Sequence, residues 1–326
     1  MKILIIQTAF IGDVILATSL VEKLHSFYPE AKNDFLLRKG NEFILANNPH
    51  VNEILIWDKK NSKYKNWWNL LFKIRNRNYD VVINVQRFLS TGLLTAFGRA
   101  KETIGFDKNP LSFLFTHRVK HVIGTKEKLV HEVDRNHALI RVLTDEKPAR
   151  PKIYPSEKDF QKLKTEGKYV TIAPASVWFT KQFPAKKWLE VIAILPQEFS
   201  VYLIGGKEDH SLCEQIREAS GKNNCINLAG QLTLIESAAL MKNAAMNFVN
   251  DSAPLHLASA VNAPVTAIFC STIPAFGFGP LSDKSFVAET KLQLDCRPCG
   301  LHGFSACPKK HFLCSEIEAT EIVKKL

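Results

Sequence analysis

Short apolar runs alternate with helical patterns along most of the chain. In residues 1–150, five short, mostly apolar stretches predict strands: KILIIQ, DFLLR, EILIW, DVVINV and KETIGF. After the first of them, apolar residues repeat at helix spacing at Val14, Ala17, Leu20, Val21, Leu24 and Phe27. The stretch KYKNWWNLLFKIRNRN predicts a basic helix with one apolar face. Strands separated by helices favour a mostly parallel sheet with both faces covered.

The stretch EKPARPKIYPSE, with three prolines and several charges, interrupts this pattern and predicts an interdomain linker. The alternation then resumes with strands predicted at YVTIAPAS, SVYLIGG, NCINLAG, AMNFVN and PVTAIF. Helices are predicted at AKKWLEVIAIL, EDHSLCEQIREA, TLIESAALMKN and PLHLASAV. We therefore expect an α/β protein with two domains, residues 1–150 and 151–326. Ligands of open α/β sheets bind beyond the carboxyl ends of the strands, so we expect the functional residues in the loops that follow the strands.

The net charge of +11 is concentrated in the first half of the chain. Residues 1–150 hold 24 Lys and Arg against 15 Asp and Glu, a net +9, whereas the remainder has 19 against 17, a net +2. A basic half indicates an anionic partner, although ordinary solvated lysines remain an alternative. No apolar run reaches the ~18 residues that span a bilayer, and the first apolar stretch is too short for a signal peptide. We expect a cytoplasmic protein, with peripheral contact on the cytoplasmic face of the inner membrane left open.

The turn after the first strand, QTAFIGDV, carries the carboxylate of Asp13 where a glycine-rich phosphate loop would usually lie. It lacks G-x-G-x-x-G, and an acidic group there would repel a pyrophosphate, which argues against an NAD-dependent oxidoreductase. The sequence also lacks an RNP, zinc-finger or helix-turn-helix signature, so we expect no nucleic-acid partner.

The loop NDSAPLHLASA follows a predicted strand and opens a helix. Asp251 and Ser252 are residues typical of helix N-caps, and amides at a helix start together with a hydroxyl attract phosphate. An ordinary cap followed by a packed His256 is the alternative interpretation.

A second loop, APASVWFTKQFPAKKW, places Ser176, Thr180 and Lys181 between a strand and a helix. Two hydroxyls and a lysine at such a position suit the neutralisation of a diphosphate. A solvated surface lysine is the alternative when this loop is considered alone.

Taken together, these loops resemble those of glycosyltransferase family 9, the bacterial heptosyltransferases. The resemblance rests on GDVILATSLVEKL, HEVDRN, TKQFPAKKW, LAGQLTLIESAALMKNA and NDSAPLHLASAVNAPVTAIF, which occur in the family's order over nearly the whole chain. It implies a GT-B fold, in which two Rossmann-like parallel-sheet domains face a central cleft. It also implies an inverting transfer of heptose from ADP-heptose to an inner-core sugar of lipopolysaccharide, an anionic glycolipid. A GT-B enzyme that uses another nucleotide sugar for a cell-surface glycan is the alternative.

By the same resemblance, residues 1–150 bind the acceptor and residues 151–326 bind the nucleotide sugar. Asp13 falls on the family's catalytic aspartate, Lys181 on its leaving-group lysine and Asp251 on its donor-binding aspartate. The resemblance implies no cofactor for catalysis. The residues expected to bind the donor are Ser176, Thr180, Lys181, Gly206, Glu208, Leu232, Thr233, Asp251, Ser252 and His256. Those expected to bind the acceptor are Gly12, Arg87 and Arg135.

The chemistry agrees with these assignments. An inverting transfer needs one base that takes the proton of the acceptor hydroxyl, a role that suits Asp13. The departing ADP gains negative charge, which Lys181 and the amides near Asp251 can stabilise without a divalent cation.

Seven cysteines are present, and the last four form the pattern C-x₂-C-x₇-C-x₆-C at Cys296, Cys299, Cys307 and Cys314. Four thiolates at this spacing suit a structural zinc or iron site. Oxidised pairs and unmetallated thiols are the alternatives, and the cytoplasmic setting disfavours disulfides. The other three cysteines lie among apolar residues and are predicted to be reduced core thiols.

Overall fold

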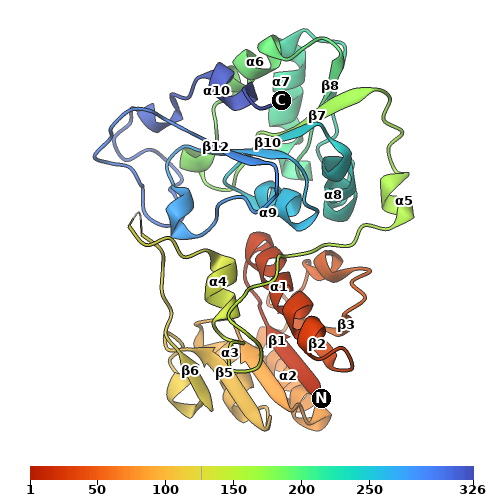
Figure 1. The fold of residues 1–326 in the computed structure, drawn as a ribbon, viewed down its shortest axis with the longest axis vertical. Helices are drawn as coiled ribbons and strands as arrows, with labels where there is room; N and C mark the ends of the chain where they lie inside the picture. Colours follow the sequence, from red (N-terminus) through yellow and green to blue (C-terminus); the bar gives the residue numbers. More distant parts are fainter. Residues whose placement is uncertain (126) are drawn as a thin grey trace. The chain divides into compact units, whose positions relative to one another are not determined.

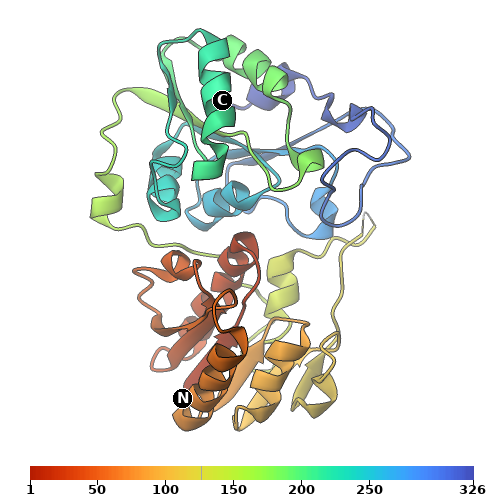
Figure 2. The same cartoon turned by 180° about the vertical axis from the view of Figure 1, so that it is seen from behind.

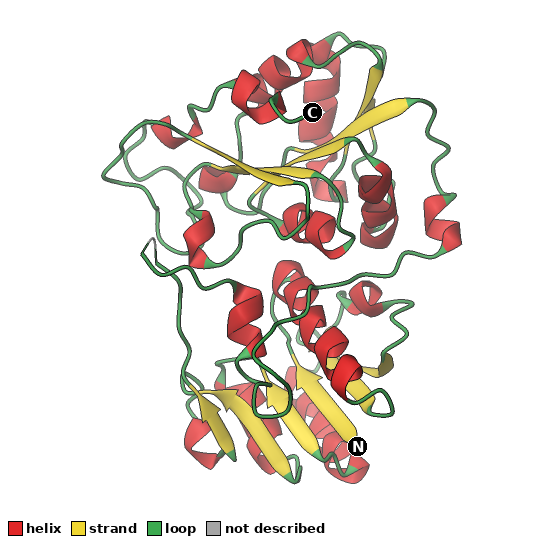
Figure 3. Cartoon of the chain, viewed as in Figure 1, coloured by secondary structure: helices red, strands yellow, loops and turns green. Residues whose placement is uncertain are grey.

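The computed structural model describes residues 1–125 and 127–326. Their contacts divide the chain into two compact units, Met1–Tyr154 and Pro155–Leu326. The division falls inside the proline-containing stretch that the sequence marks as a linker. Figure 1 labels the elements along the chain, and Figure 3 colours them by type.

The unit Met1–Tyr154 is built on a six-stranded sheet of order β3-β2-β1-β4-β5-β6, in which every neighbouring pair is parallel. Helices α1 and α4 cover one face of this sheet and α2 and α3 cover the other, as Figures 1 and 2 show from opposite sides. The strands are β1 (Lys2–Ile6), β2 (Lys32–Arg38), β3 (Val51–Trp57), β4 (Val81–Asn84), β5 (Glu102–Phe106) and β6 (His117–Val119). The helices are α1 (Ile11–Phe27), α2 (Lys63–Arg77), α3 (Leu89–Phe97) and α4 (Glu132–His137), with 3-10 turns η1 (Glu42–Leu45) and η2 (Ser112–Leu114).

The unit Pro155–Leu326 repeats the arrangement with a parallel sheet of order β12-β11-β10-β7-β8-β9. Helices α6, α7 and α10 pack together, and α8 packs on α9 and α5. The strands are β7 (Lys168–Ala173), β8 (Phe199–Leu203), β9 (Cys225–Asn227), β10 (Met246–Asn250), β11 (Val265–Phe269) and β12 (Ser285–Glu289). The helices are α5 (Glu157–Phe160), α6 (Ala185–Ile194), α7 (His210–Ser220), α8 (Leu234–Asn243), α9 (Ala253–Ala260) and α10 (Ala319–Val323), with 3-10 turns η3 (Phe179–Lys181), η4 (Lys207–Asp209), η5 (Pro274–Phe276) and η6 (Leu313–Ser315).

The predicted α/β architecture with two parallel sheets is confirmed. Central strands such as β1, β4 and β10 are buried along nearly their whole length, which explains their continuous apolar runs. Among the described residues, no helix combines the length and the apolar character that crossing a bilayer requires.

The strand order places a topological switch point in each sheet, where neighbouring strands lead their loops in opposite directions. In the first unit the switch lies between β1 and β4, which are followed by Asp13 and Arg87. In the second it lies between β7 and β10, which are followed by Lys181 and Asp251. The same sheet order therefore brings candidate residues of each unit to the edge where ligands of such folds bind.

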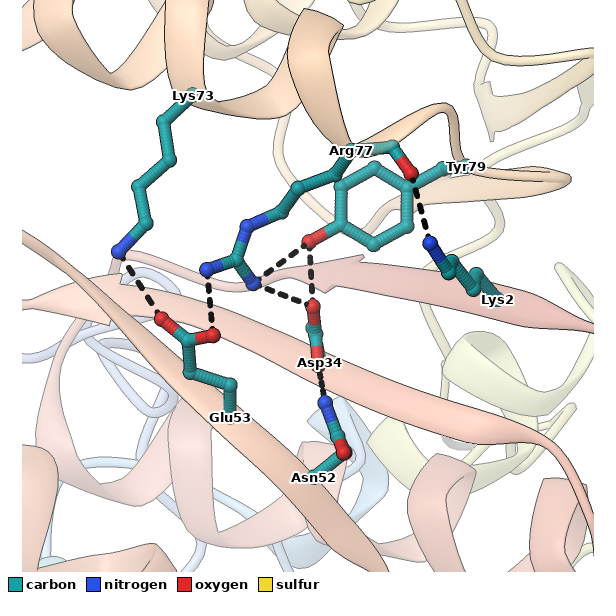
Figure 4. Close-up of polar contacts among 7 residues, drawn as sticks. All are labelled: Lys2, Asp34, Asn52, Glu53, Lys73, Arg77 and Tyr79. Carbon is teal, nitrogen blue, oxygen red and sulfur yellow. Dashed lines mark hydrogen bonds and ion pairs between the residues drawn. The ribbon is translucent and has the colours of Figure 1, made fainter.

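A network of charged groups joins α2 to the starts of β2 and β3 (Figure 4). The buried carboxylate of Asp34 accepts hydrogen bonds from the Tyr79 hydroxyl at 2.6 Å and from Arg77 Nη1 at 2.7 Å. Arg77 also pairs with Glu53, whose other oxygen accepts from Lys73 Nζ at 3.0 Å. Burial and the neighbouring Asp34 carboxylate raise the pKa of Tyr79, which keeps its hydroxyl a donor. The network joins α2 to the sheet near the amino ends of β2 and β3. The candidate residues follow the carboxyl ends of the strands, at the opposite edge of the sheet.

Candidate functional site

The centre of the candidate site in Pro155–Leu326 is an ion pair between Lys181 and Asp251. Lys181 Nζ lies 2.7 Å from Asp251 Oδ2, and the two side chains are 15% and 6% exposed. The same carboxylate oxygen accepts a hydrogen bond from Thr272 Oγ1 at 2.6 Å. The predicted leaving-group lysine and the predicted donor-binding aspartate are thus in direct contact at the switch point of the sheet.

Asn250, which the sequence prediction missed, holds the loop of Lys181 in place. It is fully buried at the end of β10. Its Oδ1 accepts from the Phe183 backbone N–H at 3.0 Å, and its Nδ2 donates to the Pro174 carbonyl at 2.8 Å. Because these bonds reach both ends of the loop between β7 and α6, Asn250 fixes the path of the chain around Lys181. Its position directly before the Asp-Ser pair was the signal in the sequence.

Helix α9 begins beside this ion pair, with Ser252 at its N-cap position and Pro254 in its first turn. The Ser252 hydroxyl does not cap the helix, and it lies 3.4 Å from the Asn250 carbonyl. His256 is buried, and its ring lies 6.1 Å from that of Phe278 in an edge-on arrangement. The positive end of the helix dipole therefore lies next to Lys181 and Asp251, in an arrangement suited to an anionic group.

The two hydroxyls predicted in the Lys181 loop have different surroundings. Thr180 is 1% exposed. Its Oγ1 accepts from the Phe304 N–H at 2.8 Å and from the Ser271 hydroxyl at 3.0 Å. Ser176 is half-buried. The structure gives the Thr180 hydroxyl partners within the protein, whereas a contact of either residue with a donor stays a prediction.

The remaining residues predicted for the donor lie after β8 and β9. The Gly206 N–H donates to Asp209 Oδ2 at 2.8 Å, and Glu208 is exposed beside it. Thr233 caps α8, because the Glu236 N–H reaches its hydroxyl at 3.3 Å and its own N–H donates to Glu236 Oε2 at 2.7 Å. Leu232, just before this cap, is half-buried. Their contacts with a nucleotide stay a prediction.

In Met1–Tyr154, Asp13 lies in the first turn of α1, directly after β1. Its Oδ2 accepts a hydrogen bond from the Phe10 backbone N–H at 3.2 Å, and Asp13 and Gly12 are both half-buried. A carboxylate in the first turn is stabilised by the helix dipole. The turn therefore holds Asp13 in a defined orientation at the carboxyl edge of the sheet.

The two arginines predicted to bind the acceptor differ in accessibility. Arg87 is exposed after β4. The Arg135 side chain is only 5% exposed, and its Nε donates to Glu132 Oε2 at 2.8 Å within α4. Burial raises the pKa of Glu132 above its ordinary value. The positive charge of Arg135 acts to lower this pKa, whereas the negative charge of Asp13 acts to raise it. The guanidinium of Arg135 thus pairs with Glu132, and a direct contact of Arg135 with an acceptor stays a prediction.

Lys59, which the sequence prediction also missed, lies after β3 at the same edge. Its Nζ donates to the Thr8 carbonyl at 2.9 Å and to the Thr8 hydroxyl at 3.0 Å. Burial, together with the charges of Arg38 and Lys63, lowers the pKa of Lys59 to about 8. Lys59 thus reaches the turn between β1 and α1 through Thr8, and the charges of Arg38 and Lys63 lie close enough to act on it. The signal in the sequence was a lysine directly after a predicted strand.

All seven cysteines are free in the part of the chain that the structure describes. Cys213, Cys225 and Cys270 are buried, as predicted, and burial raises the pKa of each. In the last four, Cys299 Sγ lies 3.2 Å from the Cys296 carbonyl, and Cys296 Sγ lies 3.8 Å from His311 Nε2. Burial acts to raise the pKa of Cys307, but N–H groups of residues 309–312 outweigh it and lower the pKa.

Within residues 1–125 and 127–326, no group of three or more His, Cys, Asp or Glu side chains is arranged to hold a metal ion. The donor set of four sulfurs suits zinc or iron chemically. A metal at Cys296, Cys299, Cys307 and Cys314 therefore stays a prediction.

The chain is similar to known members of one protein family. The family model of glycosyltransferase family 9 (heptosyltransferase) matches residues 67–301. Lipopolysaccharide heptosyltransferase 3 of Escherichia coli K12 is 29% identical over 287 residues, 81% of each chain. Lipooligosaccharide heptosyltransferase 2 of Haemophilus influenzae is 26% identical over 320 residues, 88% of each chain.

The fold is also found in a solved structure of the same class. The structure of the E. coli ADP-heptose lipopolysaccharide heptosyltransferase II superimposes with a TM-score of 0.78, at 24% identity, over 92% of this chain and 96% of that chain. This likeness supports the two-sheet architecture. Since the family model covers most of the chain, the protein belongs to glycosyltransferase family 9, the heptosyltransferase family.

Proposed function

We propose that this glycosyltransferase moves a heptose from ADP-heptose to an inner-core sugar of lipopolysaccharide, with inversion at the anomeric carbon. The observation that carries the proposal is the Lys181–Asp251 ion pair beside the start of α9. Support comes from the family and from relatives named as lipopolysaccharide heptosyltransferases. A solved structure of similar fold bears the name E. coli ADP-heptose lipopolysaccharide heptosyltransferase II.

In the proposed reaction, Asp13 acts as the general base. Its carboxylate takes the proton from the acceptor hydroxyl while that oxygen forms a bond to the anomeric carbon. The bond between this carbon and the diphosphate oxygen breaks, and ADP leaves with the electron pair. Attack opposite the leaving group inverts the configuration. General-base catalysis typically contributes about 10²–10⁴-fold in rate.

The proposal gives Lys181 and the first turn of α9 the task of stabilising the departing diphosphate. A preorganised ammonium group and helix-start amides act most strongly where water is partly excluded. Lys181 is largely buried and pairs with Asp251, and the carboxylate of Asp251 is in turn held by the Thr272 hydroxyl. These groups carry the charge of the leaving group without a divalent cation in the proposed mechanism. Activity that survives chelation with EDTA supports this part, and activity that requires added Mg²⁺ contradicts it.

The acceptor in the proposal is an anionic glycolipid bound by Met1–Tyr154. The net charge of residues 1–150 and the cationic groups of Arg38 and Lys63 close to Lys59 support an anionic acceptor. Arg87, exposed at the neighbouring strand end, adds a planar donor that suits carboxylate or phosphate oxygens. Peripheral contact with an anionic membrane surface follows as part of the same proposal.

The experiment that tests the function compares ADP- and UDP-activated sugars as donors, with a lipopolysaccharide-core acceptor and Asp13→Asn as the control. Transfer from ADP-heptose that Asp13→Asn lacks supports the proposal. Transfer only from another nucleotide sugar favours the alternative GT-B enzyme. A thermal-shift response to NAD or oligonucleotide, with none to ADP, rejects both.

A further inference from the structure

The cysteine-rich segment, residues 295–314, lies directly against the loop that carries Lys181. The Phe304 N–H donates to Thr180 Oγ1 at 2.8 Å, and the Thr180 N–H donates to the Phe304 carbonyl at 3.1 Å. This reciprocal pairing joins two parts of the chain that lie far apart in the sequence. It consumes both the backbone N–H and the hydroxyl of the residue that precedes Lys181.

A second connection runs through Ser271, just after β11. The Cys299 N–H donates to the Ser271 carbonyl at 2.8 Å, and the Ser271 hydroxyl donates to Thr180 Oγ1 at 3.0 Å. The Thr180 hydroxyl is therefore held from two sides, once directly by the segment and once through a residue that the segment holds.

A third connection reaches the other member of the ion pair. Arg297 donates to the carbonyls of Cys270 at 2.7 Å and of Thr272 at 2.8 Å. Thr272 in turn donates its hydroxyl to Asp251 Oδ2 at 2.6 Å. The cysteine-rich segment thus contacts Thr180, which precedes Lys181, and Thr272, which donates to Asp251. It therefore touches a neighbour of each member of the ion pair.

Gly303 is placed at the tightest point of this contact. Its φ is +75°, and a Cβ on it would lie 2.9 Å from Thr180 Oγ1 and 3.1 Å from Lys181 Cγ. Gly300 in the same segment has a similar φ of +66°, but a Cβ there would meet only Phe304 Cζ, at 3.7 Å. A side chain at position 303 therefore pushes against the Lys181 loop, whereas one at position 300 does not.

We propose that the cysteine-rich segment positions the Lys181–Asp251 pair for sugar transfer, with Thr180 and Gly303 as its contact points. Thr180 is then a positioning residue that acts through Lys181. The proposal rests on the proposed role of Lys181 in stabilising the leaving group. It assigns the segment a function whether or not its thiols bind a metal.

The test compares Thr180→Val with Thr180→Ser. Valine keeps the shape of the side chain but removes the hydroxyl, whereas serine keeps the hydroxyl. We expect Thr180→Val to lose about 10- to 100-fold in kcat, because small displacements of a catalytic group have effects of this size. KM for the donor should change much less, and Thr180→Ser should recover most of the rate. Equal kcat values for folded Thr180→Val and Thr180→Ser overturn the proposal.

The glycine pair gives a second, independent comparison. Gly303→Ala should lower kcat, whereas the matched control Gly300→Ala, which carries similar backbone strain, should stay close to wild type. Equal losses in the two variants overturn the proposal, because strain anywhere in the segment would then explain them. If Gly303→Ala fails to fold, the comparison of Thr180→Val with Thr180→Ser tests the proposal by itself.

A measurement that does not depend on turnover separates this proposal from the proposed function. The rate at which an amine reagent labels Lys181, relative to the exposed Lys186, should rise in Thr180→Val and stay at the wild-type value in Thr180→Ser. An unchanged ratio in Thr180→Val overturns the positioning role. Wild-type protein that transfers no sugar from any nucleotide donor overturns the proposed function instead, while the labelling ratio still reports on the segment.

Discussion

Lys181 and Asp251 form a 2.7 Å ion pair between the loops that follow β7 and β10. These two strands are neighbours in the sheet although a long stretch of chain separates them. The pair therefore exists only because the sheet order brings the two loops together. Its place beside the start of α9 makes it the most specific chemical feature of the second unit.

Replacement of Lys181 should lower the turnover of each folded enzyme molecule. We expect Lys181→Ala to lower kcat by about 10²–10³-fold, the usual effect of removing one donor that stabilises a leaving oxyanion. Steady-state kinetics with ADP-heptose measures this, and the exposed Lys186→Ala serves as control. A kcat of Lys181→Ala equal to that of the control excludes Lys181 from the reaction.

Removal of the Arg135 guanidinium should destabilise the protein. Burial already raises the pKa of Glu132, so Arg135→Gln leaves a buried carboxylate without the positive charge that opposes this shift. Loss of one partner of such a pair costs about 3–5 kcal/mol. Urea unfolding checks this, and the double variant Glu132→Gln/Arg135→Gln should regain part of the loss. A free energy of unfolding equal to wild type for Arg135→Gln contradicts the buried pair.

Lys59 should behave as an unusually reactive amine. Its pKa is lowered to about 8 from the ordinary 10.5, so near pH 8 a large part of it is neutral. The folded state favours the neutral form, so Lys59 contributes stability above pH 10.5 that is lost as the pH falls through about 8. An acylating reagent at pH 8 should label Lys59 faster than the exposed Lys60, as mass spectrometry can show. Equal labelling rates for Lys59 and Lys60 would mean that the pKa of Lys59 is not lowered.

The same titration predicts a pH dependence of acceptor binding. Below about pH 8 Lys59 is charged and attracts an anionic acceptor, so KM for the acceptor should rise as the pH passes upward through this value. Lys59→Met should show a higher acceptor KM that no longer changes in this window. An acceptor KM with the same pH profile in both proteins removes Lys59 from the acceptor site.

The network around Asp34 should be a major source of stability in the first unit. Asp34 is buried and accepts bonds from Tyr79, Arg77 and Asn52. Asp34→Ala should therefore cost about 3–5 kcal/mol in the free energy of unfolding. Lys73→Gln in the same network, where the lysine side chain is 48% exposed, should cost less than about 1 kcal/mol. Similar costs for the two variants in urea unfolding contradict this ranking.

Much of the fold could be predicted because its strands and helices have strong hydrophobic patterns. The strands β6 and β12 were missed since His117–Val119 is short and polar and Ser285–Glu289 is only partly buried. Helix α4 was missed for a related reason: EVDRNH shows no apolar face, and its residues are held by ion pairing and packing against α1.

The sequence predicted those parts of the candidate site that lie in recognisable motifs. It did not predict the parts that depend on contacts between distant stretches of the chain. Asp13, Lys181 and Asp251 each lie in a recognisable loop after a strand. The link between Thr180 and Phe304 joins distant stretches of sequence, and no local pattern indicates it. Likewise, the burial of Arg135 and its pairing with Glu132 depend on how α4 packs, and the sequence alone, which predicted Arg135 as an acceptor-binding residue, did not indicate them.

The measurement that tests the account most directly is turnover of Asp13→Asn with ADP-heptose and a lipopolysaccharide-core acceptor, alongside its affinity for ADP. Asparagine has nearly the same shape and can still accept the Phe10 N–H bond, but it cannot take up a proton. We predict a loss of at least about 10²-fold in kcat with an ADP dissociation constant close to wild type. Turnover retained by Asp13→Asn would contradict it.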